Sequence, residues 1–123
     1  MDNLYKENIL DHYNNPRNKR VLESPSIFGR EYNALCGDDI MVYAQANDEG
    51  IIQELTFVGE GCAISQAAAS LFTEYVKGKR VDETVKMGRE DVEALLGIPL
   101  STVRARCALL PVQALRNGLC NKI

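Results

Sequence analysis

Cysteine and aspartate residues in two short loops of this chain are suited to hold a metal ion. The first loop, residues 34–39, contains Cys36 and Asp38, and the second, residues 59–62, ends in Cys62. Thiolates and carboxylates are both ligands of divalent metals. Between Cys36 and Asp38 stands a glycine, which lets the backbone turn tightly so that the thiolate and the carboxylate can point at one ion. The two loops therefore predict half of a metal site.

A β-hairpin is predicted to bring the two loops together. Residues 40–46 and 51–58 are rich in β-prone side chains, and residues 47–50 between them form a turn-forming set that ends in glycine. Two antiparallel strands of similar length return the chain to the end at which it started. Cys36 and Cys62, 62 − 36 = 26 positions apart, are therefore expected to be neighbours in space.

The segment that follows Cys62 is predicted to be a helix. Residues 63–78 are rich in alanine and end in Lys-Gly, which is typical of a helix with a C-terminal glycine stop. Cys62 would then lie at the helix N-terminus, where free N–H groups and the helix dipole favour an anion. In that position the pKa of a thiol, ordinarily about 8.5, shifts towards the thiolate that binds metal.

The other segments predict an α+β fold for the chain, residues 1–123, as a single domain. A third strand at residues 26–33 completes a small three-stranded antiparallel sheet that helices cover on one face, with the metal site exposed at one end. The expected helices are residues 4–13, 81–87 and 89–96, and residues 17–26 are expected to be a solvated polar connector.

Pro111 determines where the last helix is expected to begin. A proline in a helix interior costs about 3 kcal/mol, so the regular helix is predicted to start near Leu110. Residues 104–107 would then be an irregular lead-in, with Cys107 near a helix N-terminus.

The single histidine, His12, falls within the first expected helix. A lone histidine with no cysteine or carboxylate at ligand spacing is weak evidence for a metal site. We therefore assign His12 to the capping or surface chemistry of that helix.

Composition limits the classes of function. Of the 123 residues, 46% are hydrophobic and 25% charged, which is typical of a soluble globular protein. The 14 basic and 17 acidic residues give a net charge of −3 and a pI of about 5.2. Because no basic face is expected, we predict that the chain does not bind nucleic acid.

The chain is also predicted to have no membrane segment. No apolar run approaches the roughly 20 residues that span a bilayer, and the charged N-terminus lacks the apolar core of a signal peptide. We therefore expect the protein to be cytoplasmic. In that reducing compartment its four cysteines are expected to be free, reactive or metal-bound rather than disulfide-paired.

The spacing of the cysteines leaves two interpretations open. Cys36, Cys62 and Cys107 each lie at an element boundary beside a glycine or a helix start, whereas Cys120 lies in the tail. They form no CxxC pair of the kind found in standard zinc motifs. They could therefore be metal ligands or small buried apolar residues, a common role of free cysteine.

The chain resembles the U-type iron–sulfur cluster assembly scaffolds, the IscU/SufU family that includes the N-terminal domain of NifU. The resemblance covers nearly the whole chain. It is carried by Cys36-Gly37-Asp38, by GEGCAIS at 59–65 and by Arg106-Cys107, together with DHYNNPRN at 11–18, NDEGII at 47–52 and TEYVKGK at 73–79.

The resemblance implies a carrier without turnover of its own. Such a scaffold receives sulfur from a cysteine desulfurase and iron from a donor, for example a frataxin-like protein, and passes a transient [2Fe–2S] cluster to recipient apo iron–sulfur proteins. By position, Cys36, Asp38, Cys62 and Cys107 match the ligands of the family, which can also hold Zn²⁺. Cys107 and Cys36 match the residues that accept sulfur. The oxygen ligand, Asp38, would form the weaker bond, which suits a scaffold that must release its product.

Two features depart from the family pattern. Where the Isc branch has a histidine before its third cysteine, this chain has Arg106, which cannot coordinate a metal. The SufU branch also lacks that histidine, but it typically has an insertion between its second and third cysteines. Here that gap is 107 − 62 = 45 positions, as short as in the Isc branch.

The second departure is in the segment that a chaperone recognises. The Leu-Pro-Pro-Val-Lys segment that the Isc-type Hsp70 chaperone recognises is replaced by PLSTVR at 99–104.

The charge of the site favours a cation beside it. Three thiolates and one carboxylate carry −4, so a +2 metal or cluster core leaves −2, which is costly to bury without compensation. Arg106, directly before Cys107, or Arg104 could offset this charge, or both arginines could be solvated.

Two alternatives to the scaffold function remain. One is a zinc-dependent sulfurtransferase of SufU type, an enzyme in which a thiolate accepts persulfide sulfur from the desulfurase and passes it on. The other is a zinc-stabilised interaction module.

Overall fold

A computed structural model describes residues 3–120, and its central element is an antiparallel sheet with the strand order β1-β2-β3. The strands are β1 (Ile27–Asn33), β2 (Asp38–Ala46) and β3 (Ile52–Glu60). Buried and half-buried residues alternate along β2, as expected for a strand with one face in the core. The predicted hairpin and third strand are confirmed, and both hairpin strands extend two residues further towards the cysteine loops.

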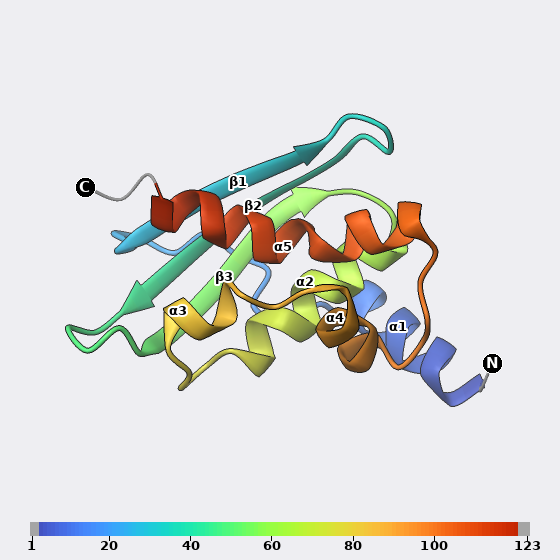
Figure 1. The fold of residues 1–123 in the computed structure, drawn as a ribbon, viewed down its shortest axis with the longest axis horizontal. Helices are drawn as coiled ribbons and strands as arrows, with labels where there is room; N and C mark the ends of the chain where they lie inside the picture. Colours follow the sequence, from blue (N-terminus) through green and yellow to red (C-terminus); the bar gives the residue numbers. More distant parts are fainter. Residues whose placement is uncertain (1–2, 121–123) are drawn as a thin grey trace.

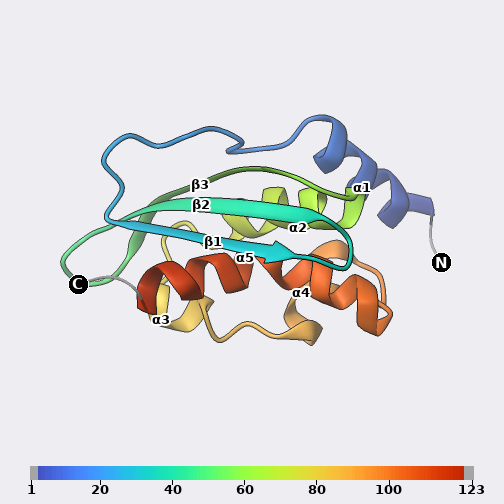
Figure 2. The same cartoon turned by 90° about the horizontal axis from the view of Figure 1, so that it is seen from above.

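The helices within residues 3–120 cover one face of this sheet. The helix α5 lies against β1 and β2, α2 lies against β3, and the two helices pack against each other (Figure 1, Figure 2). This arrangement confirms the expected α+β class. None of these helices is both long and apolar enough to cross a bilayer. The helices are α1 (Asn3–Asn14), α2 (Ala63–Tyr75), α3 (Val81–Thr84), α4 (Arg89–Leu96) and α5 (Thr102–Cys120).

The core lies between the sheet and the two long helices. Its largest fully buried side chains include Phe57 of β3, Phe72 of α2 and Leu115 of α5. On α2 three successive alanines are buried. The backbones of β1 and α5 approach each other closely. A Cβ added to Gly29 would overlap the carbonyl oxygen of Ala114, so the two backbones touch.

Helix α5 differs from the prediction. It begins at Thr102 and continues through Pro111, whereas we expected a start near Leu110. A proline at this position removes one hydrogen bond and costs about 3 kcal/mol. The apolar side chains of this helix are buried against the sheet, and each large one stabilises the fold by roughly 1.5–3 kcal/mol. The packing therefore outweighs the effect of the proline. These buried residues include Leu110, Pro111, Val112 and Leu115.

The predicted boundaries of the other helices are partly confirmed. The helix α4 covers residues 89–96 as expected and is capped by Gly97 with φ 79°. In contrast, α2 ends at Tyr75 rather than at residue 78, and α3 is a single turn over Val81–Thr84 rather than a helix over 81–87. Element boundaries depend on local cap geometry, and a residue pattern alone predicts them less well than it predicts the element itself.

The connector between α1 and β1 is not the solvated loop that we expected. The carbonyl oxygen of Asn18 accepts a 3.0 Å hydrogen bond from the Phe57 N–H, and Lys19 pairs with Phe57 in parallel orientation. The Asn18 side chain also donates to Thr73 Oγ1 at 3.2 Å. Strand β3 presents unpaired backbone groups on this edge, and the connector satisfies the N–H of Phe57 among them.

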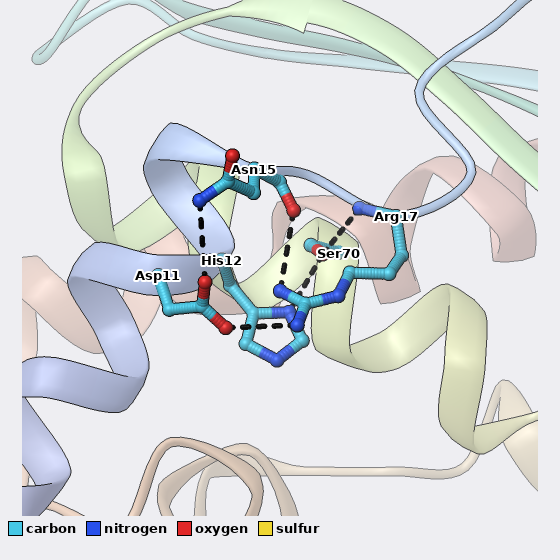
Figure 3. Close-up of polar contacts among 5 residues, drawn as sticks. All are labelled: Asp11, His12, Asn15, Arg17 and Ser70. Carbon is cyan, nitrogen blue, oxygen red and sulfur yellow. Dashed lines mark hydrogen bonds and ion pairs between the residues drawn. The ribbon is translucent and has the colours of Figure 1, made fainter.

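His12 does not have the capping or surface role that we predicted. Its side chain is buried, and its Nδ1 atom lies 2.7 Å from Ser70 Oγ of α2 (Figure 3). The Arg17 backbone N–H donates to the same hydroxyl at 2.9 Å, and the Arg17 guanidinium pairs with Asp11 at 2.8 Å. Burial, together with the nearby Arg17 charge, lowers the pKa of His12. The histidine therefore joins α1 to α2 as part of the fold.

Candidate metal centre

The four predicted ligands come together at one end of the sheet. Sγ of Cys107 lies 3.4 Å from Sγ of Cys36, and Sγ of Cys62 lies 3.4 Å from Oδ2 of Asp38. The ligand atoms of Cys36, Asp38 and Cys107 all lie within 4.8 Å of one another. In Figure 1 this is the end where the β1–β2 turn, the β3–α2 connection and the first half of α5 meet. Cys120 lies at the opposite end of α5, about 20 Å further along the helix.

The turn between β1 and β2 presents Cys36. It is closed by a 2.7 Å hydrogen bond from the Gly37 N–H to the carbonyl oxygen of Asn33. Gly37 has φ +74°, a left-handed conformation that glycine adopts without a steric penalty. The predicted role of this glycine as the turning point is therefore confirmed. The carboxylate of Asp38 follows directly as the first residue of β2.

Cys62 is the N-cap residue of α2, as predicted from the alanine-rich segment after it. Its backbone N–H donates a 2.9 Å hydrogen bond to Oδ1 of Asp38, and its thiol lies beside the other oxygen of the same carboxylate. Asp38 therefore orients the start of α2 while remaining next to a thiol. The hairpin β2–β3 sets this contact, because it aligns Asp39 with Glu60 at the end nearest the site.

The burial of Asp38 makes the site suitable for a cation. The residue is 1% exposed, and among residues 3–120 no lysine or arginine forms an ion pair with it. A buried carboxylate without a positive partner is costly. A divalent metal ion or a cluster at the three sulfur atoms would supply the missing charge, and a set of three sulfur donors and one oxygen suits Zn²⁺ or an iron–sulfur centre.

The environment of Cys107 differs from our prediction. It lies in the second turn of α5, five residues after Thr102, rather than near the helix N-terminus. The favourable effect of a helix dipole is confined to the first turn. Cys107 is also only 2% exposed, and this burial, followed by its contact with Cys36, raises its pKa above the ordinary value. Binding of a metal at this thiol must therefore release a proton.

The site is open to solvent on the side of the other two cysteines. Cys36 and Cys62 are exposed, whereas Cys107 and Asp38 are buried. All four cysteines are free thiols in this structure. A metal ion can therefore reach the site from the side of Cys36 and Cys62.

Asn33 belongs to the site but was missed in the sequence analysis. Its Nδ2 lies 3.8 Å from Sγ of Cys107, and its Oδ1 accepts a 3.1 Å hydrogen bond from the Leu35 N–H. Asparagine before a turn often bonds the backbone two residues later, so the second contact had a recognisable signal. The contact with Cys107, 74 positions away, had none.

Arg104 and Arg106 are both exposed, and neither guanidinium has a hydrogen bond or an ion pair with the site residues within the described part of the chain. Arg104 lines an apolar cavity of about 240 Å³ beside α1. Arg106 lines a separate polar cavity of about 300 Å³ between β1 and α5. That either arginine offsets the charge of the site stays a prediction.

Gly61 leaves room for the Asp38 carboxylate, so a side chain added at this position should weaken metal binding without removing a ligand. A Cβ at this position would lie 2.5 Å from Oδ1 of Asp38 and 2.5 Å from Ser65 Oγ. We therefore expect Gly61→Ala to displace the carboxylate and to lower zinc affinity by about tenfold, the scale seen when groups that orient ligands are changed. Competition with a chromophoric chelator measures this affinity.

Gly50→Ala is the control for Gly61→Ala. Gly50 also resists substitution, because its φ is +80°, but it has open space around it and lies at the far end of the hairpin. Its variant should be less stable than the parent and should keep the parent's zinc affinity. If Gly61→Ala kept the parent's zinc affinity as well, the space at Gly61 would not be needed to position the Asp38 carboxylate.

Residues 4–121 match the family of NifU-like N terminal domains. The chain belongs to this family. The match covers nearly the whole chain, and it confirms the resemblance that the cysteine motifs indicate. The family match thus identifies the fold without using the positions of the four side chains.

Two relatives of this NifU-like chain are named for different functions. "Zinc-dependent sulfurtransferase SufU" of Bacillus subtilis (strain 168) is 37% identical over 139 aligned positions, which cover 99% of this chain and 93% of the relative. "Iron-sulfur cluster assembly scaffold protein IscU" of Escherichia coli (strain K12) is 33% identical over 120 positions, which cover 95% of this chain and 92% of the relative. In the first comparison at least 139 − 123 = 16 positions have no counterpart in this chain. In length the chain is thus more similar to the E. coli relative.

Solved structures of the NifU-like family share the fold. A crystal structure of a scaffold candidate for the SUF system of Fervidobacterium islandicum AW-1 has a TM-score of 0.79 and 25% identity, covering 92% of this chain and 94% of that one. The N-terminal NifU-like protein of Brucella abortus has a TM-score of 0.76 and 23% identity, covering 97% and 94%. These likenesses support the observed three-stranded sheet covered by helices.

Proposed function

We propose that this protein is a scaffold on which [2Fe–2S] clusters are assembled and from which they are transferred. The observation that carries the proposal is the meeting of three thiols and one carboxylate, from three separate segments, at an end of the sheet that is open to solvent. The E. coli relative is named as such a scaffold, which supports the same assignment here. The protein would act as a carrier, with the cluster as its cargo.

Each ligand would have a distinct role in this function. Thiolates of Cys36, Cys62 and Cys107 suit iron of the cluster. Asp38 adds an oxygen ligand, which binds iron less strongly than sulfur does, so it is the ligand that a recipient protein displaces first. Of the two cysteines matched to sulfur acceptors, Cys36 is exposed and Cys107 is buried. We therefore assign sulfur acceptance to Cys36.

The proposed function requires partners. A cysteine desulfurase would supply sulfur, an iron donor such as a frataxin-like protein would supply iron, and apo iron–sulfur proteins would receive the cluster. We place these exchanges in the cytoplasm, where reducing conditions keep exposed thiols such as Cys36 and Cys62 unpaired. We also propose that residues 1–123 act as one domain, since the family match spans residues 4–121.

A zinc-dependent sulfurtransferase activity is the second candidate function. It is favoured by the 37% identity to the B. subtilis sulfurtransferase and by the exposure of Cys36. In this function Zn²⁺ would occupy the same four residues, and the thiolate of Cys36 would take persulfide sulfur from the desulfurase and pass it to an acceptor.

Anaerobic reconstitution separates the candidate functions. The full chain is incubated with ferrous iron, a cysteine desulfurase and cysteine, and its absorption and circular dichroism are recorded before and after an apo-ferredoxin is added. We expect stable [2Fe–2S] absorption and transfer of the cluster to the ferredoxin. Retained zinc with faster desulfurase turnover would instead support the sulfurtransferase. If neither were observed, a zinc-stabilised interaction module would be the better description.

A further inference from the structure

The proposed function does not use a polar cavity of about 300 Å³ that lies beside the thiols. It lies between the end of β1 and the first half of α5, and Glu31, Asn33, Arg106 and Gln113 are among its lining residues. Its volume is at the lower end of the range of small-molecule sites. The cavity is therefore large enough for a ligand of amino-acid size.

The cavity carries two opposite charges that do not pair with each other. Arg106 has no ion pair within residues 3–120, although Glu31 lines the same cavity. The Glu31 carboxylate is held in place by the Tyr32 N–H at 3.1 Å and by Asn117 Nδ2 at 3.2 Å. Each oxygen keeps a free acceptor position. A ligand with both a carboxylate and an ammonium group would satisfy Arg106 and Glu31 together.

Asn33 connects this cavity to the thiols. It lines the cavity, and its Nδ2 lies 3.8 Å from Sγ of Cys107, which is itself 3.4 Å from Sγ of Cys36. Cys36 is the exposed member of that pair. A ligand anchored by its two charges would thus have its third substituent beside Asn33, on the side of the cavity that faces the Cys107–Cys36 pair.

We propose that this cavity binds a free α-amino acid thiol of the cysteine class, which removes sulfur from Cys36 as a small-molecule persulfide. The inference rests on the proposed function, because it requires Cys36 to carry sulfur. The α-carboxylate pairs with Arg106, the α-ammonium group with Glu31, and the thiol faces Asn33 and Cys36. Arginine suits this role because its planar guanidinium can bind a carboxylate through two hydrogen bonds.

The transfer balances without an added oxidant or reductant. The ligand thiolate attacks the outer sulfur of the Cys36 persulfide, so a new S–S bond forms on the ligand and the S–S bond on Cys36 breaks. Cys36 leaves as a thiolate and takes up the proton that the ligand thiol lost. The products are the ligand persulfide and the free Cys36 thiol.

Binding is tested first, with a probe that cannot react. S-methyl-L-cysteine is titrated into the full chain as purified, and amide signals are followed by NMR. We expect the signals of Tyr32, Asn33 and Arg106 to shift, and both Arg106→Gln and Glu31→Gln to weaken binding by about tenfold. Arg30→Gln is the matched control, because Arg30 precedes Glu31 on β1 but points to the other face, where it pairs with Asp39.

This titration is independent of cluster assembly. Binding by a chain that fails reconstitution would support the cavity and refute the scaffold. Absence of these shifts in a chain that assembles clusters would overturn the inference and leave the scaffold intact. An equal loss of binding in Arg30→Gln would also overturn it, since a general charge effect would then explain the result.

The transfer step is tested with chain that a desulfurase has loaded with sulfur and that is then desalted. The loss of the added sulfur from Cys36 is followed by mass spectrometry with L-cysteine, cysteamine or 3-mercaptopropionate at equal thiolate concentrations. We expect L-cysteine to react about tenfold faster than the other two. Arg106→Gln should remove its advantage over cysteamine, and Glu31→Gln its advantage over 3-mercaptopropionate. Equal rates for the three thiols with the parent chain would overturn the proposal.

Discussion

Replacing Cys107 with serine is expected to lower the affinity of the full chain for zinc by at least about 100-fold. Changes that only disturb the orientation of a ligand already cost 10- to 100-fold, and this change removes a ligand. Its Sγ lies 3.4 Å from that of Cys36 and within 4.8 Å of the Asp38 carboxylate. Cys36→Ser and Cys62→Ser should have effects of the same order. Competition with a chromophoric chelator under anaerobic conditions measures all three.

Cys120→Ser is the control for these variants. Cys120 is exposed at the last turn of α5, far from the other three cysteines. The zinc affinity of the Cys120→Ser variant should therefore equal that of the parent. Because Cys107 is buried, the unfolding of each metal-free variant must also be measured, so that a loss of structure is not mistaken for a loss of a ligand. If Cys120→Ser lost as much zinc as Cys107→Ser, the assignment of the site would be wrong.

Replacing Gly29 with alanine is expected to destabilise the fold by about 3 kcal/mol or more. Overpacking a core typically costs 1–3 kcal/mol, and the added Cβ would here overlap the carbonyl oxygen of Ala114 in α5. A backbone atom of a long helix cannot move aside as the end of a flexible side chain can. Chemical unfolding in urea, with the change in midpoint converted through the m-value, measures the loss.

Two further variants make this second prediction specific. The first is Gly118→Ala. Gly118 is on the α5 side of the contact between β1 and α5, where a Cβ would be 2.5 Å from the carbonyl oxygen of Phe28. In an exposed helix the change would stabilise by about 1 kcal/mol, so a net loss of stability would reveal the clash. Arg30→Ala, on the outer face of β1, removes only an exposed ion pair and should leave the stability close to that of the parent. If Gly29→Ala left the stability unchanged, β1 and α5 would have to be further apart than in this structure.

Much of the candidate site could be predicted because its signals are local. A turn-forming segment between two β-prone runs predicts a hairpin, and this hairpin brings Asp38 to Cys62. An alanine-rich run after Cys62 predicts a helix that starts there. Gly37 marks the turn that presents Cys36. Each of these features depends on residues a few positions apart, whose conformational preferences act before any tertiary contact forms.

Other features depend on contacts between distant segments. Helix α5 continues through Pro111 because the buried apolar side chains of this helix outweigh a lost hydrogen bond, and this changes the position of Cys107 from a helix start to a buried second turn. His12 is buried where α1 packs on α2, and Ser70, 58 positions later, forms a hydrogen bond with its ring nitrogen. No pattern within α1 could have indicated that partner.

The sequence by itself therefore determined the family, the strand and helix types, and the identity of the four residues that meet at the candidate site. Only the tertiary structure decided which of them face solvent, that Asn33 lies next to Cys107, and that Arg106 lines a cavity with Glu31. Residue type and short-range spacing govern local conformation. Exposure and the neighbours of a side chain depend instead on how β1, α2 and α5 pack, and packing is a property of the whole chain.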